Sequence, residues 1–216
     1  MSDINVFDLN QVLNKYNLIP NGIIHIGAHL GEEKNLYNTY KTNEKTIWIE
    51  ANPELIKQLK KNVDNDIVIN EALSNEIKEC TFNITSSITD LNNTQSSSLK
   101  DLDYHLIAHP NVYVSKKIII KTNTMKNVII EQNINMNNYD FLNIDTQGSE
   151  LDILQGFEEY LYNIKYIYAE INVKELYKNI ALLPVLDDFL YKNGFERVET
   201  IIHNDVGWGQ GFYIRK

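Results

Sequence analysis

Short apolar runs alternate with segments of helical spacing along most of the chain. Such runs have the length of buried strands, whereas apolar positions three and four residues apart favour amphipathic helices. Strands are therefore predicted over residues 23–26, 46–50, 67–73, 139–145 and 165–171, with helices between them. Because strands and helices alternate, the pattern predicts a parallel sheet with right-handed crossovers.

The two ends of the chain differ from this pattern. At the start, apolar positions recur at helical spacing up to Pro20-Asn21-Gly22, which predicts an N-terminal helix within residues 1–21. Near the end, a helix over 184–190 is expected to stop at Asn193-Gly194. Two strands, over 195–203 and 211–215, then flank a glycine-rich tip and predict an antiparallel hairpin.

The middle of the chain is less regular and predicts an insert over residues 80–121. Strands are expected over 80–84 and 117–121, and the polar, serine-rich stretch between them is either a solvated loop or a segment that recognises a substrate. The 216 residues, 43% of them hydrophobic, can bury one large core, so a single domain over 1–216 is predicted.

Charge and cysteine content exclude several classes of protein. The formal net charge of −9 disfavours a nucleic-acid partner, since such binding depends on Lys and Arg side chains that neutralise phosphates. The lone Cys80 excludes an internal disulfide and a thiolate metal cluster. No apolar run approaches the roughly 18 residues of a membrane span, and the N-terminus does not resemble a signal peptide. A soluble, intracellular and therefore cytoplasmic protein is expected.

The first predicted strand leads into a glycine-punctuated turn, which is the most informative motif. Gly27 and Gly31 allow a sharp turn and a close approach of a ligand to the backbone of Ala28 and His29, and the first N–H groups of the next helix would face that ligand. About 20 residues later, Glu50 ends the second strand, where its carboxylate can accept both hydroxyls of a ribose. The third glycine of dinucleotide sites is absent, so S-adenosylmethionine is favoured over NAD.

Acidic residues also follow later strands. Asp145 ends its strand beside the predicted switch in strand order, where it could accept from a ligand ammonium group, orient a hydroxyl, act as a general base, or merely cap the next helix. Glu170 and Asn172 end the following strand, and with Asp145 they could hold a magnesium ion. A metal is not favoured, because carboxylates that border a cleft more often bind hydroxyls directly.

Several ordered segments resemble the FkbM-type S-adenosylmethionine-dependent methyltransferases from about residue 22 onward. The segments are Ile26-Gly27-Ala28-His29-Leu30-Gly31, Glu50-Ala51-Asn52-Pro53, Glu71-Ala72-Leu73-Ser74, Ser97-Ser98-Leu99, Asp145-Thr146-Gln147-Gly148-Ser149-Glu150 and Leu154-Gln155-Gly156. The chain departs from the family at His29, where Asn is more frequent, and at Gln147, where Glu is frequent.

The resemblance implies an α/β, Rossmann-like class I methyltransferase fold with a seven-stranded, mostly parallel sheet. It implies O-methylation of a hydroxyl on a sugar, glycan or small metabolite, with residues 80–121 recognising the acceptor. Asp145 and Glu170 become the candidate catalytic residues. The candidate cofactor contacts are Gly27, Ala28, His29, Gly31, Glu50, Ala51, Ala72, Ser74, Ser98 and Asp145.

Aromatic and histidine side chains allow further hypotheses. Trp208 and Phe212 form either an aromatic wall for a sugar or ordinary core packing. His25 lies in a strand and is expected to be structural, whereas His105 and His109 lie in the insert without the further ligands of a zinc site.

Three other functions remain as alternatives. An NAD-dependent oxidoreductase lacks support because no Tyr-x-x-x-Lys pair accompanies the glycine turn, and a nucleic-acid N-methyltransferase lacks its Asn/Asp-Pro-Pro-Tyr/Phe element. A non-catalytic nucleoside-binding module is opposed by the acids at positions 50, 145 and 170.

Overall fold

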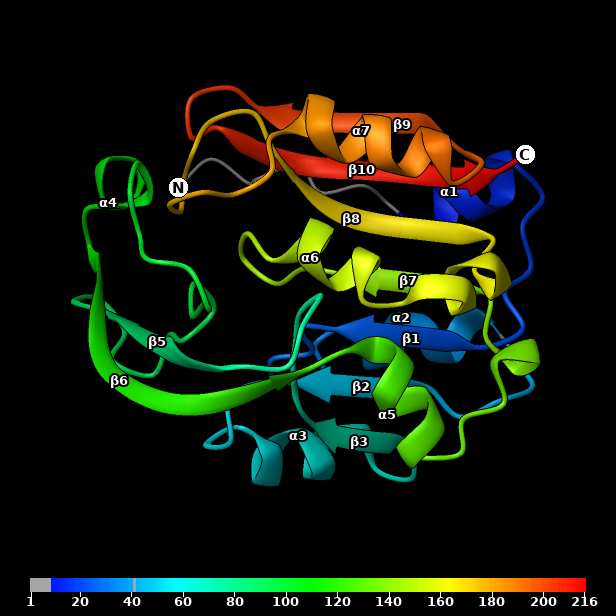
Figure 1. The fold of residues 1–216 in the computed structure, drawn as a ribbon, viewed down its shortest axis with the longest axis horizontal. Coiled ribbons are helices and arrows are strands. Elements are labelled where there is room, and N and C mark those ends of the chain that lie inside the picture. Colours follow the sequence, from blue (N-terminus) through cyan, green and yellow to red (C-terminus); the bar gives the residue numbers. More distant parts are fainter. Residues whose placement is uncertain (1–8, 41) are drawn as a thin grey trace.

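The computed structural model describes residues 9–40 and 42–216, which form a central sheet flanked by helices (Figure 1). Seven strands make the sheet in the order β3-β2-β1-β7-β8-β10-β9, and β10 alone runs opposite to the other six. The prediction of a mostly parallel sheet with a C-terminal antiparallel hairpin is therefore confirmed. The strands are β1 Ile23–Ile26, β2 Ile47–Glu50, β3 Ile67–Asn70, β7 Phe141–Ile144, β8 Tyr166–Asn172, β9 Phe195–His203 and β10 Trp208–Arg215.

Helices cover both faces of this sheet because successive side chains of each strand point to opposite sides. In β1, Ile24 and Ile26 face one hydrophobic cluster and Ile23 faces the other. The first cluster contains side chains of α5 Met125–Glu131, α6 Glu150–Gln155 and α7 Leu183–Lys192, and the second contains those of α1 Leu9–Lys15, α2 Lys34–Tyr37 and α3 Ile56–Val63. Short 3-10 helices complete the layers: η1 Asn38–Tyr40, η2 Met136–Asn138 and η3 Glu158–Asn163.

The predicted insert forms a second sheet at one end of the molecule (Figure 1). Its strands, in the order β4-β6-β5, are β4 Ala72–Leu73, β5 Glu79–Ser87 and β6 Val112–Asn123, and α4 His105–Ala108 precedes β6. The single strand predicted over 67–73 was wrong. The Asn70 side chain donates to the carbonyl of Glu50 at 2.8 Å where pairing with β2 ends, and Ala72–Leu73 then pair with β6.

Three element boundaries also differ from prediction. The helix expected directly after Gly31 begins only at Lys34. The sequence Asn52-Pro53-Glu54 predicts the start of a helix, because it has a capping side chain, a proline and an acid in the order typical of a first turn. The helix α3 begins only at Ile56, because the Asn52 side chain closes a preceding turn by accepting from the Glu54 N–H at 3.1 Å. The tip of the hairpin is shorter than predicted, since β10 already begins at Trp208.

Within the span predicted for the N-terminal helix, the structure has α1 over Leu9–Lys15, and residues 1–8 of that span lie outside the described residues. Within the described part of the chain, every helix is too short or too polar to traverse a lipid bilayer.

Candidate active site

The turn after β1 is held tightly against the two neighbouring strands. The N–H groups of Gly27 and Ala28 both donate to the Ile49 carbonyl of β2, at 2.9 and 3.1 Å. Gly27 has φ +84°, and a Cβ atom there would lie 1.7 Å from the carbonyl oxygen of Asp145. The glycine is therefore required by the close approach of β1 and β7. The N–H groups of Gly27 and Ala28 are thus engaged within the protein, and the N–H groups predicted to face a ligand are those of the next helix, α2.

Glu50 is held at the end of β2 by backbone donors. One carboxylate oxygen accepts from the His29 N–H at 2.8 Å and the other from the Asn52 N–H at 2.7 Å. Burial raises the pKa of Glu50 although these hydrogen bonds oppose the shift. A carboxylate oxygen can accept more than one hydrogen bond, so both oxygens retain capacity for a pair of ligand hydroxyls.

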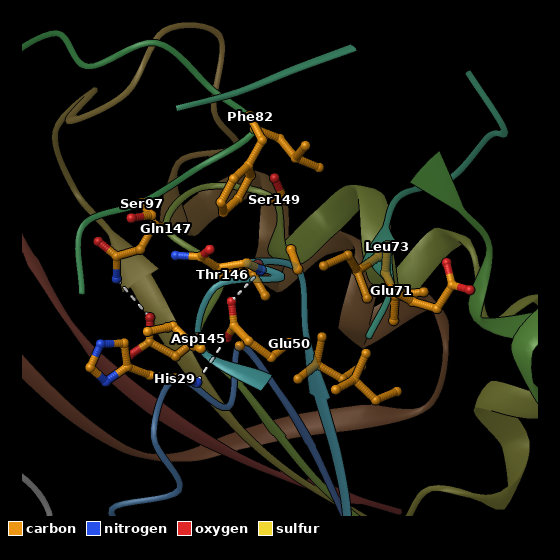
Figure 2. Close-up of a pocket in the computed structure, with 18 of the residues that line it drawn as sticks. His29, Glu50, Glu71, Leu73, Phe82, Ser97, Asp145, Thr146, Gln147 and Ser149 are labelled. Carbon is orange, nitrogen blue, oxygen red and sulfur yellow. Dashed lines mark hydrogen bonds between the residues drawn. The ribbon is translucent and has the colours of Figure 1, made fainter. Parts of the chain in front are cut away.

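A narrow crevice opens beside Glu50 (Figure 2). Apolar side chains form much of its wall, and Figure 2 shows Leu73 and Phe82 around the same space as Glu50. Of the predicted cofactor contacts, this wall contains Gly27, His29, Glu50, Ala51 and Asp145.

The other predicted contacts lie outside this wall. Gly31 packs toward Val63 and Leu59 of α3, and Ala28 borders a second, adjoining cavity. Ala72, Ser74 and Ser98 are buried. The crevice is lined instead by their neighbours in the sequence, namely Leu73 between Ala72 and Ser74, and Ser97 and Leu99 on either side of Ser98. Each of these three predicted residues is therefore one position away from a residue that lines the crevice, because adjacent side chains of an extended backbone point in opposite directions.

Three acidic side chains converge where β7 and β8 reach the cleft. Asp145, Glu150 and Glu170 each place one carboxylate oxygen within 4.8 Å of the others. Burial, followed by the nearby charges of Asp145 and Glu150, holds the pKa of Glu170 well above its ordinary value. The amide of Gln147 bridges two of the acids, donating to Asp145 Oδ1 at 2.7 Å and to Glu170 Oε2 at 2.6 Å.

Gln147 is itself fixed in this position. Its side-chain oxygen accepts from the Tyr177 hydroxyl at 2.5 Å, and its backbone carbonyl accepts from the Ser98 hydroxyl at 2.7 Å. The residue has φ +58°, in the left-handed region. Neither Gln147 nor Tyr177 was predicted as a site residue, although the Gln for Glu departure at position 147 was visible in the sequence.

The acidic cluster does not fit a divalent cation in this arrangement. Glu150 accepts from the backbone N–H groups of Thr146 and Gly148, at 2.8 Å and at 3.1 to 3.2 Å, and so serves to close the turn before α6. The amide donor of Gln147 lies between the other two acids. In the alternative set of Asp145, Glu170 and Asn172, the side-chain amide of Asn172 places an N–H donor, at 3.3 Å, against Glu170.

A larger cavity of about 450 Å³ adjoins the crevice, sharing Gly27, His29, Gln95, Asp145 and Gln147 with it. Its floor contains side chains from adjacent strands, because His25, Asn143 and Tyr168 are in register across β1, β7 and β8. Burial lowers the pKa of His25 to about 4.

The two aromatic residues predicted either to face a sugar or to pack in the core, Trp208 and Phe212, lie in different places. Trp208 borders the larger cavity, with its ring 4.8 Å from that of His203. Phe212 is fully buried in the second hydrophobic cluster, so it belongs to the core.

Comparison with known proteins agrees with this arrangement. A family model for the methyltransferase FkbM domain matches residues 25–197. No curated protein matches the chain.

Similar folds occur among solved structures of low sequence identity. The ribosomal protein L11 methylase from Lactobacillus delbrueckii subsp. bulgaricus has 10% identity and a TM-score of 0.51, covering 96% of this chain and 76% of that one. The magnesium protoporphyrin IX methyltransferase from Synechocystis PCC 6803, with bound S-adenosylmethionine, has 7% identity, a TM-score of 0.51 and the same coverages. M. capricolum TrmK, in complex with S-adenosylhomocysteine, has 15% identity and a TM-score of 0.50, covering 99% of this chain and 69% of that one.

The fold is thus the Rossmann-like fold of class I methyltransferases, and the family match extends over most of the chain. The chain belongs to the FkbM family of S-adenosylmethionine-dependent methyltransferases.

Proposed function

We propose that the protein transfers a methyl group from S-adenosylmethionine to a hydroxyl of a sugar, a glycan or another small metabolite. The observation that carries this proposal is the junction of two spaces at one acidic cluster. The crevice beside Glu50 and the 450 Å³ cavity both border Asp145 and Gln147. When bound, S-adenosylmethionine supplies the electrophilic methyl group.

The crevice has the hydrogen-bond acceptor and the apolar wall that this cofactor needs. Glu50 would accept from the ribose hydroxyls, and Ile49, Leu73 and Phe82 would pack against the adenine. The acidic groups where the crevice meets the cavity favour the cationic end of the molecule, because opposite charges attract strongly in a partly buried site.

Asp145 and Glu170 would divide the acid and base roles at the acceptor hydroxyl. Burial raises the pKa of Glu170 well above its ordinary value, which favours the protonated form that can donate a hydrogen bond. Asp145 would then orient the acceptor hydroxyl and take its proton as the oxygen gains the methyl group. The bridging amide of Gln147 keeps the two groups apart and in place. These roles require no metal.

Cofactor binding separates this proposal from its rivals. We expect thermal stabilisation by S-adenosylhomocysteine and none by NAD. Stabilisation by NAD alone would favour the oxidoreductase, and no response to either compound would favour a non-catalytic module.

Catalysis is tested with a labelled methyl donor and a panel of glycosides and small alcohols. Asp145→Asn should lower kcat by a factor of about 10² to 10⁴, the usual contribution of a positioned base. Asp152→Asn is the matched control, because Asp152 lies on α6 and pairs with Lys100 at 2.7 Å, away from the cavity lining. Equal activity of the Asp145 variant and the wild type would refute the assigned role.

A further inference from the structure

Two residues that line the larger cavity each have a buried polar atom without a hydrogen-bond partner among the described residues. The atoms are His105 Nδ1 and Gln210 Oε1, and their residues are only 4% and 7% exposed. Buried polar atoms in folded proteins are nearly always paired. Two unpaired atoms on residues that line one cavity therefore indicate the place of a ligand's polar groups.

His105 is held rigidly at this wall although it belongs to the insert. The backbone N–H of His105 donates to the Leu176 carbonyl at 3.1 Å, and the centroid of its imidazole ring lies 5.2 Å from the ring centroid of Tyr177. Tyr177 in turn donates to Gln147, so His105 is connected to the acidic cluster through packed side chains. Burial, followed by the neighbouring His109, lowers the pKa of His105 to about 4. The imidazole is therefore neutral near pH 7.

Gln210 approaches the same cluster from the sheet. It pairs with Glu170 in the register of β8 and β10, and directly opposed residues of antiparallel strands have neighbouring side chains on the same face. A neutral amide thus lies beside the proposed catalytic acid, and a neutral imidazole borders the same cavity.

The acidic side chains around the cavity have no basic counterpart among the described residues that line it. The described residues that line it include Glu32, Glu33, Asp145 and Glu170 but no Lys or Arg. His25 and His105 are neutral near pH 7. Burial opposes protonation of His29 but the hydrogen bond and charge of Glu32 raise its pKa, and the Nδ1 atom of His29 is already paired with Glu32 at 2.6 Å. A phosphate or carboxylate entering this space would lose its hydration without gaining a cationic partner, which is strongly unfavourable.

We infer that this cavity is the acceptor site, that His105 and Gln210 bind the acceptor's hydroxyl groups, and that the acceptor is a polyhydroxy compound without anionic groups. The inference rests on the proposed methyl transfer and specifies its substrate class. The cavity volume of about 450 Å³ lies within the range of small-molecule sites.

Ligand-observed NMR on the full chain saturated with S-adenosylhomocysteine tests this inference. The probes are methyl β-glucoside, glucosamine, glucose 6-phosphate and glucuronate. We expect the first two to bind and the two anions to show no binding. His105→Ala and Gln210→Ala should each weaken binding of methyl β-glucoside about fivefold or more, as expected for loss of a hydrogen bond to a buried polar site. Their affinity for S-adenosylhomocysteine should match that of the wild type.

His203→Ala is the matched control, because His203 Nε2 is also buried without a partner among the described residues but lies outside the cavity lining. His105→Gln, which keeps a hydrogen-bonding group, should recover part of the binding and guards against a folding defect.

Tighter binding of the anionic probes, unchanged binding in both alanine variants, or no binding of any probe would overturn the inference. Failure of S-adenosylhomocysteine itself to bind would refute the proposed function, and the inference with it.

Discussion

Replacing Gly27 with Ala would test whether the close approach of β1 and β7 builds the active site. The new Cβ atom would lie 1.7 Å from the Asp145 carbonyl oxygen and 2.7 Å from its carbonyl carbon. Since both obstacles are backbone atoms, no side-chain rotation relieves them. The two segments would have to separate by more than about 1 Å, and the Asp145 carboxylate would move with its backbone.

Gly194→Ala provides a matched control for the backbone strain. Gly194 has φ +83° against +84° for Gly27, but its added Cβ would meet only the end of the Arg215 side chain, at 3.3 Å. An alanine at positive φ costs about 1–2 kcal/mol, so Gly194→Ala should lower the free energy of unfolding by that amount. Gly27→Ala should cost about 1–3 kcal/mol more, the usual penalty of overpacking.

Urea denaturation measures both free energies, and calorimetry with S-adenosylhomocysteine measures the site. We expect Gly27→Ala to weaken binding at least about tenfold, which corresponds to about 1.4 kcal/mol, whereas Gly194→Ala should bind as the wild type does. Two variants of equal stability and equal affinity would show that the contact between the Gly27 turn and Asp145 is unimportant, and would refute the reasoning.

Three other predictions follow from the same geometry. Glu50→Gln leaves one side-chain oxygen that can accept hydrogen bonds, whereas both oxygens of Glu50 accept them now. Calorimetry should therefore show about tenfold weaker binding of S-adenosylhomocysteine. Glu71→Gln, at a residue that lines the same crevice, is the control and should bind nearly as the wild type does. The folded-state pKa of His25 is about 4, below its ordinary value of 6.5, so the unfolded chain binds a proton more readily than the folded chain between these pH values. The free energy of unfolding should therefore fall by up to about 3 kcal/mol as pH drops from 6.5 to 4. Urea denaturation of His25→Gln should show a shallower decline with pH than the wild type, and equal slopes would contradict this. Methyl transfer should be unaffected by EDTA, because the Gln147 amide donor lies between Asp145 and Glu170 where a cation would have to bind both acids; loss of activity restored by Mg²⁺ would contradict this.

The core sheet could be predicted from the sequence because its strands are short, apolar and bounded by turn residues. The insert was harder, since β6 extends from Val112 to Asn123 although the strand pattern was recognised only over 117–121. The break between β3 and β4 was missed for a different reason. No glycine or proline marks it, and the hydrogen bond of Asn70 to the end of β2 depends on a strand distant in sequence.

The candidate site divides in the same way. Gly27, Glu50 and Asp145 could be found because glycine at a turn and acids at strand ends have a local physical cause. Tyr177 and Gln210 could not, because their roles come from the register of β8 with β10 and from the packing of the insert against residues 173–178.

The second sheet borders the crevice and the cavity at once. It contributes Leu73 and Phe82 to the crevice, while α4, directly before β6, contributes His105 to the cavity. Any shift of this sheet therefore changes the shape of both spaces together. A substitution within the insert should consequently alter the kinetic constants for both substrates.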